Sequence, residues 1–262
     1  MNKEVDSTVY LMYHELELPG RPLCQNEPGY VRYIVKLKDF ESQTQWLKTK
    51  SWRGMSVSEA LSSAKKTGVA LTFDDGCETD FLSVAPVLKQ ANFNATFYVT
   101  VGFLEMPGYM SRSQVRQLSD LGFEIGSHSM THAYLSDLSD DALQAEIANS
   151  KNELEQMTGR SIEHFSCPGG RWNQRVARFA RQAGYRSVAT SRSVANSSGA
   201  DPFRLGRVAV MRETDLRTFR KLCQGHGLWR LQAQDLIRAT AKSIFGNSGY
   251  DRMRSALLGR NQ

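Results

Sequence analysis

The chain has 262 residues, of which 40% are hydrophobic and 23% are charged, and this composition is typical of a globular protein. The length suits one large domain, and α/β barrels of this size are commonly undivided. No run of eighteen apolar residues exists, which argues against a transmembrane helix, and the N-terminus lacks the apolar core of a secretory signal. We therefore expect a cytoplasmic protein whose four widely spaced cysteines are reduced thiols.

The net charge of +6 is unevenly distributed. Residues 202–262 contain 12 Lys and Arg against 4 Asp and Glu, so this part carries +8 and the first 201 residues carry −2. A basic segment of this kind favours peripheral contact with anionic surfaces such as lipid headgroups or phosphate-bearing carriers. A solvated basic helix face explains the same charges, and both interpretations stay open. No nucleic-acid partner is expected.

In chain order, the first predicted element is a strand at Ser7–Tyr13, which places His14 at its end. Because the carboxyl ends of the strands carry the chemistry in α/β barrels, His14 is a candidate site residue. A short strand is expected at Tyr30–Leu37, and Asp39 is expected to cap the helix that follows. A shorter helix is predicted at Ser56–Ala64.

The next strand, Val69–Phe73, runs into the adjacent carboxylates Asp74 and Asp75 and then Gly76. Neighbouring side chains on a strand point to opposite faces, but where the strand ends and curls at a glycine both can turn toward one cavity. A plain Asp-Asp-Gly turn explains the stretch by itself. A second stretch, further along the chain, favours the interpretation that both carboxylates face a cavity over that of a plain turn.

That second stretch is a short strand, Phe123–Ile125, followed by a glycine and then by His128 and His132. Two histidines four residues apart are a familiar pair of metal ligands, because a compact loop brings both imidazoles to one side. With Asp75 they supply three ligands and leave one position for water, as in catalytic zinc sites. We expect one divalent metal, with Zn²⁺ favoured and Co²⁺ or Ni²⁺ as alternatives.

Strands and helices alternate through most of the remaining chain, which predicts a parallel α/β sheet that is closed or nearly closed. Apolar residues at helical spacing, with Ser or Asn caps and Gly or Asn stops, define the helices. The further helices are predicted at 83–91, 113–121, 139–159 and 173–184, and the further strands at 95–100, 163–166, 185–190 and 207–210.

The pattern changes in the last part of the chain. Residues 228–245 are amphipathic, and residues 250–258 repeat this pattern more weakly. We expect residues 1–215 to form the barrel domain and 216–262 a basic helical extension packed on it. Attachment of this extension to the inner membrane face is the alternative.

The two carboxylate and histidine stretches resemble motifs of the polysaccharide deacetylase family, the NodB-like carbohydrate esterases of carbohydrate esterase family 4. That family carries T-F-D-D-G, then H-S-x-x-H, and Thr72–Gly76 and His128–His132 match these motifs residue for residue. The resemblance covers about residues 8–210, and the opening Tyr13-His14 is similar to deacetylases that act on exopolysaccharide. It implies an α/β fold: a distorted (β/α)7-type barrel, here with a C-terminal helical extension.

The resemblance also implies a metal-dependent hydrolase that removes N-acetyl groups from amino sugars such as N-acetylglucosamine units. Asp75, His128 and His132 are then the metal ligands, and Asp74 is the general base. In the exopolysaccharide-associated subgroup, a histidine near the N-terminus replaces one from the family's last motif. This makes His14 the candidate general acid, with a structural role as the alternative.

The third family motif usually reads R-x-P-aromatic-G and follows the two others. Here it is Ser166–Gly170, so the arginine and the aromatic residue are missing. Pro168, Gly169 and Gly170 form a loop from which a backbone N–H is expected to donate to the oxyanion, because glycine permits close approach.

Three further residues near this loop or on a later strand are candidates for the site. Arg171 and Arg207 could each replace the family arginine that orients Asp74, with a surface position as the alternative for both. Trp172 could provide the aromatic surface on which a sugar stacks. A half-buried position in the core explains this residue equally well.

Two other functions stay open at this stage. The altered third motif favours a non-catalytic carbohydrate-binding protein on the same fold, whereas the intact carboxylates and histidines speak against it. A hydrolase of another amide would use the same metal chemistry, because specificity resides in loops. A cytoplasmic enzyme with a basic tail is expected to act on a lipid-linked intermediate of exopolysaccharide synthesis, a precursor or a short oligosaccharide rather than a finished wall polymer.

Overall fold

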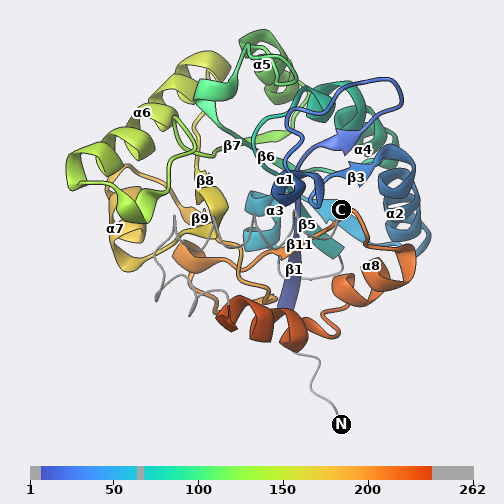
Figure 1. Ribbon diagram of the computed structural model, residues 1–262. Coiled ribbons are helices and arrows are strands. Elements are labelled where there is room, and N and C mark those ends of the chain that lie inside the picture. Colours follow the sequence, from blue (N-terminus) through green and yellow to red (C-terminus); the bar gives the residue numbers. More distant parts are fainter. Residues whose placement is uncertain (1–6, 64–67, 238–262) are drawn as a thin grey trace.

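The computed structural model describes residues 7–63 and 68–237. A mainly parallel sheet curls into an incomplete barrel, and helices cover its outer side (Figure 1). The predicted alternation of strands and helices is therefore confirmed. The strands of this sheet are β1 (Ser7–Tyr13), β4 (Arg53–Met55), β5 (Gly68–Phe73), β6 (Thr96–Val99), β7 (Glu124–Ser127), β8 (His164–Ser166), β9 (Ser187–Ala189), β10 (Asn196–Ser197) and β11 (Val208–Ala209).

The strand order brings the predicted site segments to one edge. Hydrogen-bonded neighbours follow the path β10-β1-β5-β6-β7-β8-β9, while β11 also pairs with β1 and β4 with β5. In the parallel pair β1 and β5, Tyr13 lies opposite Phe73, so His14 and Asp74 leave the sheet side by side. The carboxyl ends of parallel strands share one edge, which is where open α/β sheets bind ligands.

The core of the barrel is built from aromatic residues on neighbouring strands. Phe73 stacks on Tyr13 and on Phe97, with ring centroids 5.1 Å apart in each pair. Phe40 from a covering helix meets Phe73 edge-on at 5.8 Å, and Phe123 meets Phe97 in the same way at 5.4 Å. Such contacts add to the gain from burying apolar surface and tie the helices to the sheet.

Several helices begin or end at the signals expected from the sequence. Ser139 and Asn173 cap helices through hydrogen bonds to the backbone, and Asn92 and Gly159 end helices in the left-handed conformation at φ 56° and 68°. The helices are α1 (Pro28–Val31), α2 (Leu37–Thr49), α3 (Val57–Ser62), α4 (Ala85–Ala91), α5 (Arg112–Asp120), α6 (Asp140–Thr158), α7 (Gln174–Gln182) and α8 (Leu216–Cys223).

The predicted strand at 30–37 is wrong for most of its length. Helix α1 occupies its start, because Pro28 at the first helical positions presets the backbone for a helical turn. Only β3 (Val35–Lys36) is extended, paired with β2 (Leu16–Glu17) in a separate small sheet. Helix α2 then begins at Leu37, so Asp39 lies in its first turn and does not cap it.

The start of the predicted C-terminal extension is integrated with the barrel. Helix α8 packs on α2, where Phe219 meets Trp46 edge-on at 6.0 Å, and Phe219 is fully buried. The predicted helix 228–245 is described as far as residue 237, and its end and residues 250–258 lie outside the described residues. In the part of the chain that is described, no helix has the length and hydropathy needed to cross a membrane.

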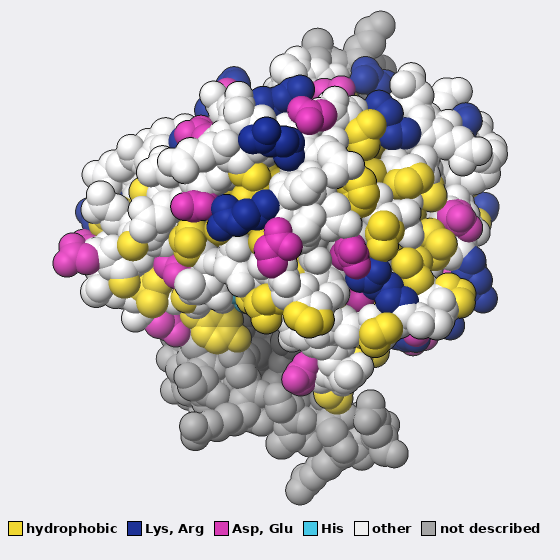
Figure 2. All heavy atoms as spheres, turned by 90° about the horizontal axis from the view of Figure 1, so that it is seen from above, with side chains coloured by type: hydrophobic (Ala, Val, Ile, Leu, Met, Phe, Trp, Pro, Cys, Tyr) yellow, Lys and Arg dark blue, Asp and Glu magenta, His cyan; other side chains and the backbone are white. Residues whose placement is uncertain are grey.

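The surface carries charges of both signs. On the face shown in Figure 2, Lys and Arg side chains are interspersed with Asp and Glu, and apolar side chains are scattered between them. Trp229, Leu236 and Ile237 near the end of the described chain are 66–70% exposed.

Candidate active site

The carboxyl ends of the strands meet around a cleft of about 620 Å³, a volume in the range of small-molecule sites. This cleft brings together most of the residues singled out in the sequence. The predicted residues that line it are His14, Asp74, Asp75, His128, His132, Gly169, Gly170, Arg171 and Trp172.

Asp75, His128 and His132, the metal triad, converge on one point. The Oδ1 atom of Asp75 lies 3.5 Å from Nε2 of His128 and 3.4 Å from Nε2 of His132. Tetrahedral zinc with ligand bonds of 2.0–2.2 Å separates its ligand atoms by roughly 3.3–3.6 Å. The triad therefore has the spacing of metal ligands.

The protonation of His128 also fits a cation. Nδ1 of His128 lies 2.9 Å from the carbonyl oxygen of Ser166 and must donate to it, so in the neutral ring Nε2 carries the lone pair that faces Asp75. Burial lowers the pKa of His128 to about 4, which keeps this ring neutral near pH 7. Within the described chain, the buried Oδ1 of Asp75 has no hydrogen-bond partner. Lone pairs that face one another in this way are stabilised by a metal ion between them.

The loops that carry the triad have unusual backbone conformations. Asp75, Ser129 and His132 all have positive φ values, of 78°, 71° and 63°. Such conformations cost of order 1–3 kcal/mol for residues other than glycine and persist where the surroundings impose them, often at functional sites. In the histidine loop, the hydroxyl of Ser129 accepts a hydrogen bond from the backbone N–H of His132 at 3.0 Å.

Glu146 on helix α6 holds the same histidine loop and was not recognised from the sequence. One carboxylate oxygen accepts hydrogen bonds from the backbone N–H groups of Met130 and Thr131 at 3.0 and 2.9 Å. The other accepts from the Thr131 hydroxyl at 2.6 Å. The sequence contains a signal for this position of Glu146, because the residue directly after it, Ile147, is buried on the inner side of α6.

Asp74 is held by Arg207, which replaces the missing family arginine. The guanidinium of Arg207 binds both carboxylate oxygens of Asp74, at 2.6 and 2.7 Å, and donates to the Ser166 hydroxyl at 2.8 Å. Arg207 is 1% exposed, so the alternative of a surface position is wrong for it. Burial disfavours a charged Asp74, but Arg207 and His128 outweigh it and hold the pKa of Asp74 well below its usual value.

Arg171 and Trp172 lie on the other side of the cleft. The Arg171 guanidinium lies 3.9 Å from the centre of the Tyr134 ring, a cation–π contact. The indole N–H of Trp172 donates to the carbonyl of Phe203 at 2.7 Å, which fixes this half-buried ring at the cleft.

The glycine loop offers one backbone donor. The N–H groups of Gly170, Arg171 and Trp172 already donate to the carbonyls of Cys167, Pro168 and Gly170, respectively. Gly169 has a positive φ of 58° and, among the described residues, its N–H has no acceptor. It is therefore the backbone N–H of this loop that is available to a ligand.

His14 lies in the same cleft, next to Asp74 at the sheet edge. Its ring packs against Tyr33, with centroids 4.9 Å apart. Its buried Nδ1 has no hydrogen-bond partner in the part of the chain that is described. The structure thus places His14 where the sequence predicted, and its role stays a prediction.

Residues 62–188 match the family model described as polysaccharide deacetylase. The chain is 29% identical over 182 residues to the putative polysaccharide deacetylase YxkH of Bacillus subtilis, covering 67% of this chain and 65% of that protein. It is 35% identical over 122 residues to a peptidoglycan-N-acetylglucosamine deacetylase of Bacillus cereus, covering 46% and 54%. The chain therefore spans between half and two thirds of the length of these two relatives.

Solved structures show the same fold. The Streptococcus pyogenes deacetylase PplD in complex with acetate has a TM-score of 0.73 at 22% identity, covering 83% of this chain and 98% of that one. IcaB from Ammonifex degensii has a TM-score of 0.72 at 22% identity, covering 84% and 97%. These two likenesses show the fold. Residues 62–188 of the chain therefore carry a polysaccharide deacetylase domain, as the family model and the two motifs in the cleft indicate.

Proposed function

We propose that the protein is a metal-dependent hydrolase that removes the N-acetyl group from an amino sugar. One observation carries this proposal: the metal triad and the carboxylate of Asp74, clamped by Arg207, face the same cleft. The reaction adds water across the amide and yields a free amine and acetate. It requires an activated water, a donor for the oxyanion and a proton for the amine.

A divalent metal held by the triad supplies Lewis acidity, which lowers the pKa of water and polarises the acetyl carbonyl. Asp74 accepts the proton of the attacking water as general base. Its ion pair with Arg207 keeps the carboxylate deprotonated and fixes its orientation.

The other two requirements are a donor for the oxyanion and a proton for the amine. The glycine loop and His14, at the end of β1, meet them. The free N–H of Gly169 donates to the oxyanion as the carbonyl becomes tetrahedral. His14 gives a proton to the nitrogen of the departing amine, for which its place beside Asp74 at the sheet edge is suitable.

The substrate proposed is an N-acetylglucosamine-type unit in a polysaccharide, an oligosaccharide or a lipid-linked precursor. Two relatives are described as a polysaccharide deacetylase and a peptidoglycan-N-acetylglucosamine deacetylase. The rings of Trp172 and Tyr134 line the cleft. One face of each ring contacts an arginine, and the opposite face is proposed to stack on a sugar. Contact of the basic tail with an anionic membrane, a cytoplasmic location and a role in exopolysaccharide synthesis stay predictions.

The test is acetate release from N-acetylglucosamine oligomers by chelator-treated protein, with and without added Zn²⁺ or Co²⁺. We expect metal-dependent release that falls at least a hundredfold in Asp74→Asn and is unchanged in the exposed control Asp120→Asn. Bound metal without acetate release would direct the search to other amides. Absence of both would leave the non-catalytic carbohydrate-binding alternative.

A further inference from the structure

We propose that Glu15, Cys24 and Cys77 form a second metal site, suited to a thiophilic divalent cation such as Zn²⁺. This cluster, the thiol site, shares no residue with the metal triad and takes no part in the mechanism above. Two sulfurs and a carboxylate oxygen are a ligand set that favours zinc over magnesium or calcium.

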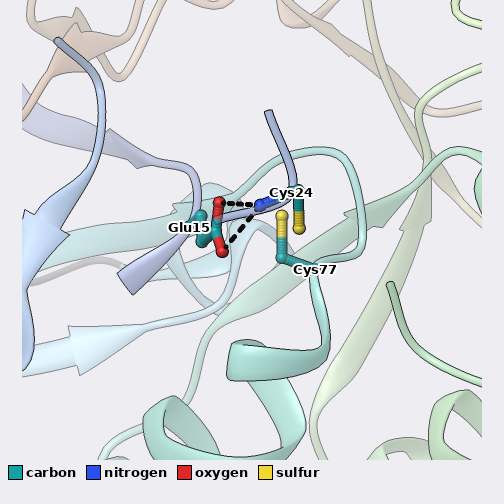
Figure 3. Close-up of side chains that lie close together, drawn as sticks. All are labelled: Glu15, Cys24 and Cys77. Atoms are coloured by element: carbon teal, nitrogen blue, oxygen red, sulfur yellow. Dashed lines mark hydrogen bonds between the residues drawn. The ribbon is translucent and has the colours of Figure 1, made fainter. Parts of the chain in front are cut away.

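The three ligands come from separate segments and converge (Figure 3). Glu15 follows β1, Cys24 lies between β2 and α1, and Cys77 follows the carboxylate turn after β5. One ligand atom from each residue lies within 4.8 Å of the other two. Tetrahedral zinc with Zn–S bonds of 2.3 Å places two sulfurs about 3.8 Å apart, so small side-chain rotations complete the geometry.

The charge of Glu15 needs a partner. This side chain is 1% exposed, and in residues 7–63 and 68–237 no Lys, Arg or His forms an ion pair with it. Its carboxylate accepts hydrogen bonds from the backbone N–H of Cys24, at 3.0 and 3.2 Å, and from the Tyr30 hydroxyl at 3.2 Å. Hydrogen bonds orient the carboxylate, but a buried charge is stabilised further by a bound cation.

Neighbouring groups also position the two sulfurs. The Tyr30 hydroxyl lies 3.4 Å from Sγ of Cys77, so it bridges this sulfur and Glu15. The thiol of Cys24 donates to the carbonyl of Gly108 at 3.1 Å. A Cβ atom at Gly108 would lie only 2.8 Å from the Cys24 sulfur, so glycine is required for this approach. A bound metal takes the place of the thiol protons.

The position of the thiol site indicates a structural role. Cys77 lies two residues after Asp75, and Tyr30 lines the cleft, so a bound ion would tie the carboxylate turn to the segment before α1. Cys24 is partly exposed and provides a path for the ion, whereas Glu15 and Cys77 are buried.

Cobalt distinguishes the two sites, because only thiolate ligands give a ligand-to-metal charge-transfer band with Co²⁺ in the near ultraviolet. The full chain is reduced, stripped with a chelator and titrated with Co²⁺. We expect the wild-type protein to show this band and to bind one more equivalent than Cys24→Ser, which loses the band. Cys223→Ser, a buried thiol of α8 outside the cluster, should keep the band, and so should His132→Ala, which removes only a triad ligand.

Zinc stabilisation gives a second readout that does not depend on activity. We expect Zn²⁺ to raise the melting temperature of His132→Ala, in which the thiol site is intact, and to raise it much less in His132→Ala combined with Cys24→Ser. A wild-type protein without the band, or a band that survives in Cys24→Ser, would overturn the proposal. So would a Cys24–Cys77 disulfide in the purified protein whose reduced form binds no Co²⁺ through sulfur.

Discussion

Arg207 and Asp74 show how one buried ion pair can orient a carboxylate although Arg207 lies outside the family motifs. Both side chains are almost fully buried, with exposed fractions of 0% and 3%, so each would be costly in the core without the other. The guanidinium offers its two nitrogens to both oxygens of the carboxylate, which fixes the plane of the carboxylate as well as its charge.

The first prediction concerns this pair. Arg207→Met leaves Asp74 buried and unpaired, which should lower the free energy of unfolding by about 3–5 kcal/mol. Arg207→Lys keeps the positive charge but loses the bidentate contact with Asp74. We expect the kcat of this variant to fall at least tenfold with KM little changed. Urea denaturation and acetate release measure the two effects. Arg212→Met is the control, since its pair with Glu17 is partly exposed and is worth about 0–1 kcal/mol.

A second prediction rests on Asp80, a fully buried carboxyl whose oxygens have no hydrogen-bond partner among the described residues. Burial, together with the negative charges of Asp75 and Glu15, raises the pKa of Asp80 well above its usual value. Between the unfolded pKa of about 3.9 and this raised value, the unfolded chain is ionised while the folded chain keeps the proton, so stability falls as pH rises.

Asp80→Asn removes this titration. The variant should melt at a higher temperature than the wild-type protein at about pH 8, and the difference should shrink toward zero at about pH 4. Melting curves across this range, recorded in a chelator, test the prediction. The exposed Asp120→Asn serves as the comparison, and an Asp80→Asn difference that did not change with pH would contradict the argument.

At the scale of elements, strand β7 delivers the two histidines and helix α6 holds the loop in which they lie. Ser127, the last residue of β7, donates its hydroxyl to Ser150 of α6 at 2.8 Å. Glu146, one turn earlier on α6, accepts hydrogen bonds from the backbone N–H groups of Met130 and Thr131 in the loop. The ligand loop is therefore fixed by a helix that follows it in the chain.

The third prediction tests this support. Glu146→Ala removes three hydrogen bonds to the histidine loop, and we expect metal affinity at the triad to fall by about 10–100-fold, as for other groups that orient ligands. Isothermal titration with Zn²⁺ on a Cys24→Ser background isolates the triad from the thiol site. Glu153→Ala on the same helix is the matched control, because Glu153 pairs with Arg112 at the surface. Equal affinities in the two variants would refute the role of Glu146.

At the scale of the whole molecule, helix α8, which begins directly after residue 215, completes the core of the barrel. Phe219, Leu222 and Cys223 of α8 are buried in the same hydrophobic cluster as the strands. The boundary predicted after residue 215 therefore separates residues that pack together, although the sequence pattern does change there.

The fourth prediction follows from this packing. Phe219→Ala leaves a cavity beside Trp46 and should lower the free energy of unfolding by about 3–5 kcal/mol. The nearby Trp229→Ala removes a ring that is 66% exposed and should change it by less than about 0.5 kcal/mol. Urea denaturation compares the two, and similar values would mean that α8 is not part of the folding unit.

Comparison with the sequence shows which elements could be predicted. The ends of helices that carry local signals were predicted correctly, as at Ser139, Asn173 and Gly159. Caps and stops act within one turn of the helix, so they can be recognised in the sequence. The strand predicted at 30–37 was wrong for most of its length, since the short helix α1 and the two-residue strand β3 depend on packing rather than on periodicity. Similarly, β10 pairs only two residues with β1 and has no pattern of its own.

The fold class and the candidate metal ligands could be predicted from the sequence alone. Alternating periodicities, turn glycines and two short motifs are local in the chain, and parallel strands necessarily bring their carboxyl ends to one edge. The contacts that hold Asp74 and the histidine loop, and the approach of the two thiols, became apparent only in the tertiary structure. Arg207 lies 133 residues from Asp74 along the chain, and Cys24 lies far from Cys77. Such pairs meet through the order and register of the strands, which single residues in a sequence do not specify.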